Sequence, residues 1–89
     1  MPYRVELSRK AQKQLDRVPD RQAERIWNAI RGLGERPIPP GAKRMSGAAP
    51  TWRMRVGEYR VLYSIFGGDN LLTIDSVKRR TTTTYKDRP

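Results

Sequence analysis

The 89-residue chain contains no cysteine and no histidine. The absence of cysteine excludes a disulfide framework, a thiolate nucleophile and a cysteine-ligated zinc or iron–sulfur site. The absence of histidine removes both the commonest general base and the commonest metal ligand of proteins. Any chemistry of this chain must therefore depend on Arg, Lys, Tyr, Asp, Glu, Ser or Thr side chains.

Apolar residues are few and long apolar runs are missing. Hydrophobic residues make up 36% of the chain, which predicts one small domain over residues 1–89 without a deep cofactor cavity. The N-terminal segment alternates apolar and polar residues, unlike a signal peptide, and nothing approaches the roughly 18 apolar residues of a membrane span. These observations predict a cytoplasmic protein that needs no cofactor and does not associate with a membrane.

Acidic residues are scarce relative to basic ones. Nineteen Lys and Arg against nine Asp and Glu give a formal net charge of +10. Residues 1–40 hold nine basic and five acidic side chains, and residues 41–89 hold ten and four. A positive charge spread over the whole domain attracts polyanions, and nucleic acid is the first candidate.

The N-terminal part of the chain predicts one strand and two helices. Residues 3–7 alternate between apolar and polar side chains, as in a strand with one buried face. Apolar residues then recur at helical spacing in two segments, with Ser8 and Asp20 as candidate N-cap residues and Gly34 as a candidate C-terminal stop.

The C-terminal part predicts an antiparallel sheet. Residues 36–50 are rich in proline and glycine and are expected to form a loop. Three strands follow, in the alternating runs 52–56 and 59–65 and in the run 71–77. The order β-α-α-β-β-β predicts a two-layer α+β domain in which the N-terminal strand and helical hairpin pack on this small sheet.

The face of the sheet that points away from the helices carries arginines. Arg53 and Arg55 lie two positions apart on one strand, so they project from the same face about 6.5–7 Å apart. Arg60 lies beside them on the next strand of the hairpin. Guanidinium groups gathered in this way can bind the oxygens of a phosphate in bidentate fashion. The plainer alternative is a set of solvated charges that protects the sheet from aggregation.

The end of the third strand adds further groups. Arg79 and Arg80 are expected to join the arginines of the open face, and Tyr85 brings an aromatic ring that can stack on a base or exchange a proton. The residues from Tyr3 to Tyr85 together resemble the RelE toxins of bacterial and archaeal toxin–antitoxin modules. The resemblance rests on the segment WRMRVGEYRVLYSI, on the strand ending SVKRR, and on the Tyr six positions after Arg79.

This resemblance implies a RelE-like fold and a ribosome-dependent endoribonuclease, an mRNA interferase that inhibits translation and arrests growth. In such toxins the RNA 2′-hydroxyl attacks the adjacent phosphate without a metal ion, and a 5′-hydroxyl leaves. Arg60 and Arg79 match the pair that stabilises the charge of the transition state. Tyr85 matches a tyrosine that takes the 2′-hydroxyl proton or stacks on the target base.

Arg53 and Arg55 depart from the pattern, because the best-known RelE toxins have lysines at these positions. A guanidinium has a pKa above about 12 and does not give up its proton, whereas a lysine can. We therefore expect slower cleavage than in a relative with lysines here. Arg55→Lys is expected to raise the single-turnover rate, and an unchanged or lower rate would contradict this explanation.

The resemblance also implies two partners. Lys43, Arg44, Lys78 and Arg80 are expected to bind mRNA or ribosomal RNA. The second partner is a cognate antitoxin, expected to be acidic and to fold on binding, so that the toxin is monomeric alone and forms a hetero-oligomer with it.

Three alternatives remain at this point. The first is a ParE-like inhibitor of DNA gyrase, because the hairpin motifs occur across the wider RelE/ParE superfamily. The second is a nucleic-acid-binding module without catalysis, and the third is a degenerate toxin that has kept only its antitoxin binding. The arginines at positions 53 and 55 keep the third alternative open.

Overall fold

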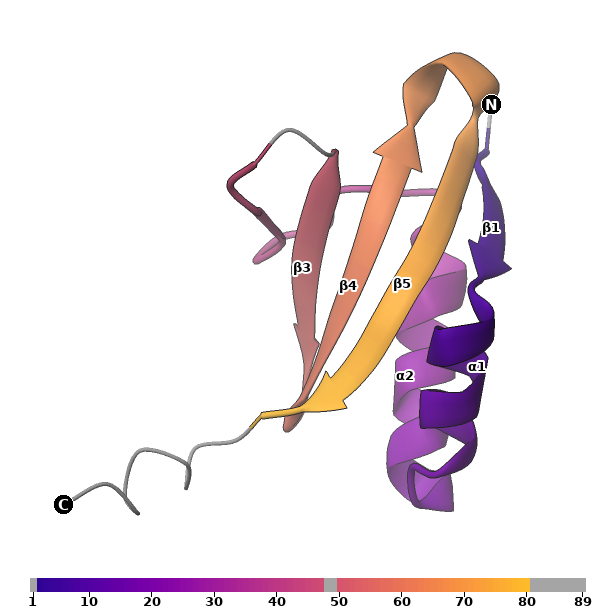
Figure 1. Ribbon diagram of the computed structural model, residues 1–89, viewed down its shortest axis with the longest axis vertical. Helices are drawn as coiled ribbons and strands as arrows, with labels where there is room; N and C mark the ends of the chain where they lie inside the picture. The colour runs from indigo at the N-terminus through magenta and orange to yellow at the C-terminus, as the bar shows by residue number, and fades with distance from the viewer. Residues whose placement is uncertain (1, 48–49, 81–89) are drawn as a thin grey trace, which may run out of the picture.

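The computed structural model describes residues 2–47 and 50–80, which form two layers (Figure 1). Five strands make one mixed sheet in the order β1-β5-β4-β3-β2, and the two helices lie together on one side of it. This arrangement confirms the predicted α+β architecture. The elements are β1 (Arg4–Leu7), α1 (Arg9–Asp16), α2 (Asp20–Gly32), β2 (Lys43–Arg44), β3 (Thr51–Val56), β4 (Tyr59–Phe66), a 3-10 turn (Gly67–Asp69) and β5 (Leu71–Arg79).

The helix boundaries agree only in part with the sequence signals. Ser8 caps α1 as predicted, since its Oγ accepts a hydrogen bond from the backbone N–H of Ala11 at 3.0 Å. The prediction for Asp20 was wrong, because Pro19 holds the N-cap position and Asp20 is the first helical residue. There its carboxylate still faces the positive end of the helix dipole. No helix within residues 2–47 and 50–80 is long and apolar enough to cross a membrane.

Gly34 has a different role from the predicted helix stop. Helix α2 ends at Gly32, and Gly34 lies buried against the residue before β1, where the N–H of Tyr3 donates to the Gly34 carbonyl at 2.8 Å. A Cβ at this position would lie 3.2 Å from the Tyr3 carbonyl oxygen. The glycine therefore allows the end of the helical hairpin to approach the sheet closely.

Two strands lie where the sequence patterns did not place them. β1 is an edge strand of the sheet and pairs in parallel with β5, with Val5 opposite Leu72. The predicted loop 36–50 contains β2, which pairs antiparallel with β3. β1 and β5 are far apart in the sequence, and β2 is too short to show an alternating pattern. Local periodicity therefore could not reveal either pairing.

The core lies between the helices and one face of the sheet. The apolar positions of the predicted runs 52–56 and 59–65 face the helices, as expected from their alternation. The fully enclosed members include Tyr63, whose hydroxyl donates to the Pro37 carbonyl at 2.8 Å and so ties the segment after α2 to the sheet. The buried core residues are Ala11, Leu15, Val18, Ile26, Ile30, Leu33, Met54, Val61, Tyr63, Leu72, Ile74 and Val77.

A β-bulge in β5 changes which of its residues face the core. Leu62 pairs with Ser76, but the next residue of β4, Tyr63, pairs with Ile74. Asp75 is therefore an extra residue in β5, and the alternation of side chains shifts by one position beyond it. Ile74 before the bulge and Val77 after it both reach the core.

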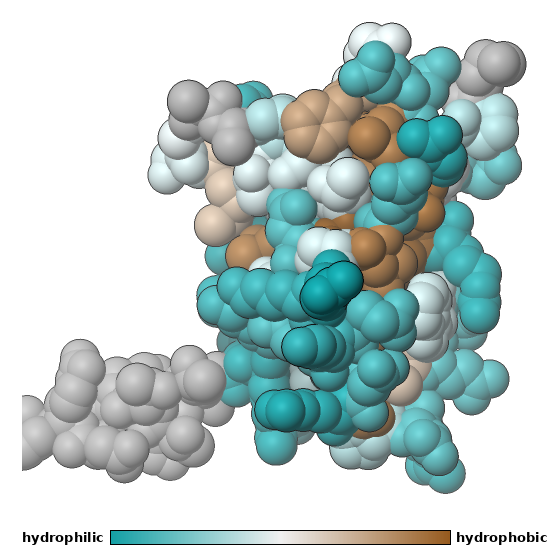
Figure 2. Space-filling model, turned by 45° about the vertical axis from the view of Figure 1, so that its right-hand side comes forward, coloured by the Kyte–Doolittle hydropathy of each residue, from teal (hydrophilic) through white to brown (hydrophobic). Residues whose placement is uncertain are grey.

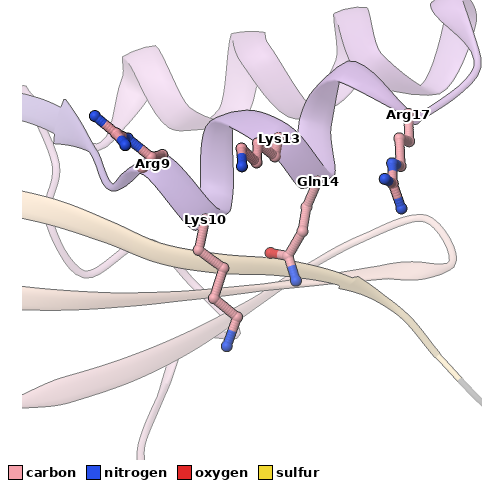
Figure 3. Close-up of a pocket in the computed structure, with 5 residues that line it drawn as sticks. All are labelled: Arg9, Lys10, Lys13, Gln14 and Arg17. Atoms are coloured by element: carbon pink, nitrogen blue, oxygen red, sulfur yellow. The ribbon is translucent and has the colours of Figure 1, made fainter.

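Helix α1 satisfies backbone groups at the bulge. The Asp75 carbonyl accepts a hydrogen bond from Ser8 Oγ at 3.1 Å, and the N–H of Val77 donates to Gln14 Oε1 at 2.7 Å. Figure 3 shows Gln14 pointing from α1 toward β5. Because buried backbone groups must be hydrogen-bonded, Ser8 and Gln14 stabilise the shifted register of β5.

Candidate nucleic-acid interface

The face of the sheet away from the helices carries a row of cations near the β3–β4 turn. Arg55 of β3 is the direct partner of Arg60 of β4, and Arg60 is the direct partner of Lys78 of β5. Partners in register project from the same face, and adjacent strands lie about 4.8 Å apart. Three positive charges from three strands therefore lie side by side.

A second row of cations lies next to the first and consists of Arg53 of β3 and Lys43 of the edge strand β2. Lys43 of β2 is the direct partner of Arg53, so the two side chains share the open face. Arg44 is the partner of Trp52, which packs against the core, so the register turns Arg44 toward the opposite face at the exposed edge. Of the two loop residues predicted to bind RNA, Lys43 thus joins the other cations and Arg44 does not.

Two adjoining hollows lie among these side chains. One of about 380 Å³ is lined by Arg53, Arg60, Lys78, Arg79 and Arg80 with Met45 and Leu62. The other, of about 320 Å³, is lined by Lys43, Arg53 and Arg55 with Pro40, Gly41 and Met54. No carboxylate of the described residues lines either hollow. We refer to Arg53, Arg55, Arg60, Lys78 and Arg80 as the cationic patch.

Among residues 2–47 and 50–80, the arginines of this patch have no anionic partner. Within the part of the chain that the structure describes, ion pairs join Arg4 to Glu6 at 3.0 Å and Arg79 to Glu58 at 3.1 Å. The Nε atoms of Arg60 and Arg80 are buried and have no hydrogen-bond partner among the described residues. A bound anion would therefore meet guanidinium groups that are not already neutralised.

Arg79 lines the same hollow as Arg60, although it is not the direct partner of Arg60 in the sheet. Its partner in the sheet is Tyr59, on the strand face that points to the core, and its Nη2 donates to Glu58 Oε1 at 3.1 Å. Lys78 takes the place opposite Arg60 instead. The physical reason is the bulge at Asp75, which shifts the alternation of β5 and makes Lys78 the direct partner of Arg60, although the Arg79 side chain still lines the same hollow as Arg60.

The other end of the open face is polar and holds a residue set that the sequence analysis missed. The Asp75 carboxylate accepts hydrogen bonds from Ser64 Oγ at 2.6 Å and from Thr73 Oγ1 at 3.2 Å, and Thr51 Oγ1 lies 3.4 Å from Ser64 Oγ. Two adjacent polar residues, Asp75 and Ser76, interrupt the apolar run of β5, and this break was the available signal for the bulge.

A second basic surface lies on the helical layer. A hollow of about 410 Å³ is lined by Arg9, Lys10, Lys13, Gln14 and Arg17 of α1 and the residue that follows it (Figure 3). In Figure 2, hydrophilic residues cover most of the lower part of the molecule, whereas hydrophobic residues gather in its upper part. The positive charge is therefore not restricted to the sheet.

One predicted site residue cannot be placed with the others. Tyr85, predicted to contact the base or the 2′-hydroxyl, lies outside the described residues. Among residues 2–47 and 50–80, no three side chains of the types Asp and Glu gather closely enough to hold a metal ion.

Comparison with known proteins places the chain among toxins. Residues 5–83 match the family model described as the ParE toxin of the type II toxin–antitoxin system parDE. A curated relative from Methanocaldococcus jannaschii, named as toxin RelE1, is 29% identical over 83 residues, which is 90% of this chain and 92% of the relative.

Two solved complexes have the same fold. The archaeal RelE–RelB complex from Pyrococcus horikoshii OT3 contains a chain with a TM-score of 0.82 and 28% identity, covering 92% of this chain and 99% of the other. The toxin–antitoxin complex RelBE2 from Mycobacterium tuberculosis contains one with a TM-score of 0.80 and 27% identity, covering 90% and 100%.

Proposed function

The chain belongs to the ParE toxin family of type II toxin–antitoxin systems, and we propose that it is an endoribonuclease that cuts mRNA in the A site of the ribosome. Its similarity to toxin RelE1 and to the toxin chains of two RelE–RelB-type complexes supports a toxin of the RelE/ParE superfamily. The finer activity rests on the chemistry of the open face of the sheet.

The observation that carries this proposal is the gathering of Arg53, Arg60, Lys78, Arg79 and Arg80 around one hollow that no carboxylate of the described residues lines. Attack of a 2′-hydroxyl on the neighbouring phosphate places additional negative charge on the phosphate oxygens. Donors fixed in advance around these oxygens stabilise that charge, and one such donor typically contributes about 10²–10³ in rate. Arg60 and Arg80 are proposed to donate to the oxygens that do not bridge the two nucleotides.

The remaining predicted catalytic residues take secondary places in this proposal. Arg53 and Arg55 extend the positive field to the next phosphate along the strand. Arg79 is proposed to hold Glu58 and the β3–β4 turn, because its guanidinium already pairs with that carboxylate. Tyr85 keeps its proposed role as proton acceptor or stacking platform.

The ribosome supplies what an 89-residue protein lacks. In-line attack requires the RNA backbone to be held in one geometry, and positioning alone lowers the barrier by several kcal/mol. A hollow open to solvent on one face of a sheet does not enclose an RNA strand. We propose that the decoding site of the ribosome fixes the mRNA, while the basic surface of α1 contributes to ribosome binding.

We propose a cognate antitoxin as the second partner. Both solved structures described above are toxin–antitoxin complexes. A net charge of +10 favours an acidic partner.

The second candidate function is inhibition of DNA gyrase, which the match to the ParE toxin model favours. The two functions differ in target rather than in fold. Purified protein that inhibits gyrase supercoiling but leaves mRNA on ribosomes intact would establish this candidate in place of the ribonuclease.

The proposed function is tested with ribosomes programmed with one defined mRNA. The wild-type protein should produce new 5′ ends within the A-site codon, and the same mRNA without ribosomes should stay intact. Arg60→Ala should lower the single-turnover rate by about 10²–10³. Wild-type protein that leaves the A-site codon uncut in this assay would overturn the proposal.

A further inference from the structure

Cleavage by 2′-hydroxyl attack ends with the departure of the 5′-oxygen of the next nucleotide. An alkoxide is a poor leaving group, so a proton donor at this oxygen accelerates the step, typically by 10²–10⁴. Arginine is unsuited to this role because its guanidinium retains its proton in proteins. Four of the five members of the cationic patch are arginines, and both positions on β3 are among them.

Lys78 is the fifth member and carries a proton that can be transferred. It is the direct partner of Arg60 and lines the same hollow as Arg60 and Arg80. The side chain is exposed at the end of β5, and in residues 2–47 and 50–80 the ion pairs involve other residues. Its ammonium is therefore free to approach a bound phosphodiester.

We propose that Lys78 is the general acid that protonates the departing 5′-oxygen, a role that rests on the proposed ribonuclease function. The 2′-oxygen forms a bond to phosphorus and loses its proton to water, directly or through a base, while the bond from phosphorus to the 5′-oxygen breaks. Lys78 Nζ gives one proton to that oxygen, which leaves as a 5′-hydroxyl. The neutral amine then regains a proton from water, so that protons and charge balance over the cycle.

The bulge at Asp75 is what makes this assignment possible. Uninterrupted alternation of β5 would turn Lys78 toward the helices and leave Arg79 on the open face. With the extra residue in the strand, the lysine lies opposite Arg60. The proton donor that β3 lacks in this chain is thus supplied by β5.

Lys43 provides a matched control. It is also an exposed lysine of the open face, but it lies on the edge strand as the partner of Arg53 and lines the neighbouring hollow. Replacement of either lysine by arginine keeps the positive charge and removes only the transferable proton.

The test compares two mRNAs on programmed ribosomes under single-turnover conditions. One is the ordinary mRNA, and the other has sulfur in place of the 5′-bridging oxygen at the bond that the wild-type protein cuts. A thiolate leaves without protonation, so a variant that lacks only the general acid should recover on the sulfur-containing mRNA. Lys78→Arg should cut the ordinary mRNA about 100-fold more slowly than wild type and the sulfur-containing mRNA within about threefold of it. Lys43→Arg should show no such difference between the two mRNAs, because any effect it has on binding is the same for both.

Two results would overturn the role of Lys78 as general acid but leave the proposed ribonuclease function standing. One is Lys78→Arg cutting the ordinary mRNA as fast as wild type, and the other is an equal loss on both mRNAs, which would show a role in binding or positioning. Wild-type protein that cuts neither mRNA would instead overturn the ribonuclease function itself. Arg55→Lys added to Lys78→Arg returns a lysine to the same row, and it should restore at least about tenfold of the lost rate.

Discussion

Neighbouring arginines in this protein have different surroundings, and these decide what each can bind. The Arg79 guanidinium is paired with Glu58, whereas Arg80, one residue later, has a buried Nε without a partner among the described residues. A guanidinium that is already paired gains less from a phosphate than an unpaired one, because the existing hydrogen bond must be exchanged. For these two arginines, the position relative to the bulge therefore decides how readily the guanidinium binds a phosphate.

Tyr63 shows a comparable effect of surroundings on a titratable group. Burial raises the pKa of its phenol from 10.0 to about 12. An unfolded chain loses this proton near pH 10, whereas the folded protein retains it up to about pH 12. The free energy of unfolding should therefore fall as the pH rises from about 10 to about 12, by at most about 3 kcal/mol from this residue.

This prediction is measured by urea unfolding at several pH values between about 9 and 12. Tyr63→Phe removes the titrating group and the hydrogen bond to Pro37, so it should be less stable than wild type by about 1 kcal/mol at neutral pH. The difference between the two proteins should then shrink and reverse as the pH rises. A difference that stays constant over this range would contradict the assigned pKa.

At the scale of the secondary-structure elements, alternation predicted some strands well and others poorly. The faces of β3 and β4 followed from sequence, because one side of each strand is buried and a slip by one residue would expose the core. β5 did not follow, because the adjacent polar residues Asp75 and Ser76 form a bulge whose direction depends on contacts with α1. The parallel pairing of β1 with β5 joins residues 67 positions apart and has no local signal.

The bulge also limits how much of the site the sequence could predict. Arg53, Arg55 and Arg60 were correctly placed on the open face from their own strands. Lys78 and Arg79 exchanged places because a single inserted residue reverses every later position of a strand. Ser8 and Gln14 stabilise this register from another element.

Gln14→Ala should therefore affect both stability and the site. The variant leaves the N–H of Val77 without its acceptor in a buried region, which should cost about 1–3 kcal/mol in the free energy of unfolding. It should also slow mRNA cleavage, because Lys78 and Arg80 follow the loosened segment directly. Urea unfolding and the single-turnover assay measure the two effects.

Gln12→Ala is the matched control on the same helix. Gln12 is exposed on α1 and donates to Asp16 at 3.1 Å within the same helix. Its replacement should change stability by less than about 0.5 kcal/mol and leave cleavage unchanged. Equal stability of the Gln14 and Gln12 variants would show that α1 does not hold the bulge.

Over the whole molecule, positive charge lies on both layers. The cationic patch occupies the open face of the sheet, and the basic hollow of α1 lies on the helical layer. Binding to an RNA surface releases counterions from the phosphates, so the affinity depends steeply on salt. This distribution suits a protein that contacts its substrate with one face and a large polyanion with another.

Ribosome affinity should accordingly fall by at least about 100-fold between 50 and 200 mM salt, as expected when several phosphates are contacted. Lys10→Gln together with Lys13→Gln should weaken binding and flatten this dependence. The cleavage rate at saturating protein should remain unchanged, since these residues lie outside the patch. Sedimentation with ribosomes at several salt concentrations measures the effect, and an affinity that varies little with salt would contradict a broad electrostatic interface.

The central claim is that the shifted register of β5 assembles the phosphate site from Arg60, Lys78 and Arg80. The most direct test is the single-turnover cleavage rate of Arg80→Ala compared with Arg79→Ala on programmed ribosomes. Arg80→Ala should lose about 10²–10³ in rate, as is expected for Arg60→Ala. Arg79→Ala should remain within a few-fold of wild type, because the Arg79 guanidinium lines the same hollow but is already paired with Glu58. A larger loss for Arg79→Ala than for Arg80→Ala would contradict the account.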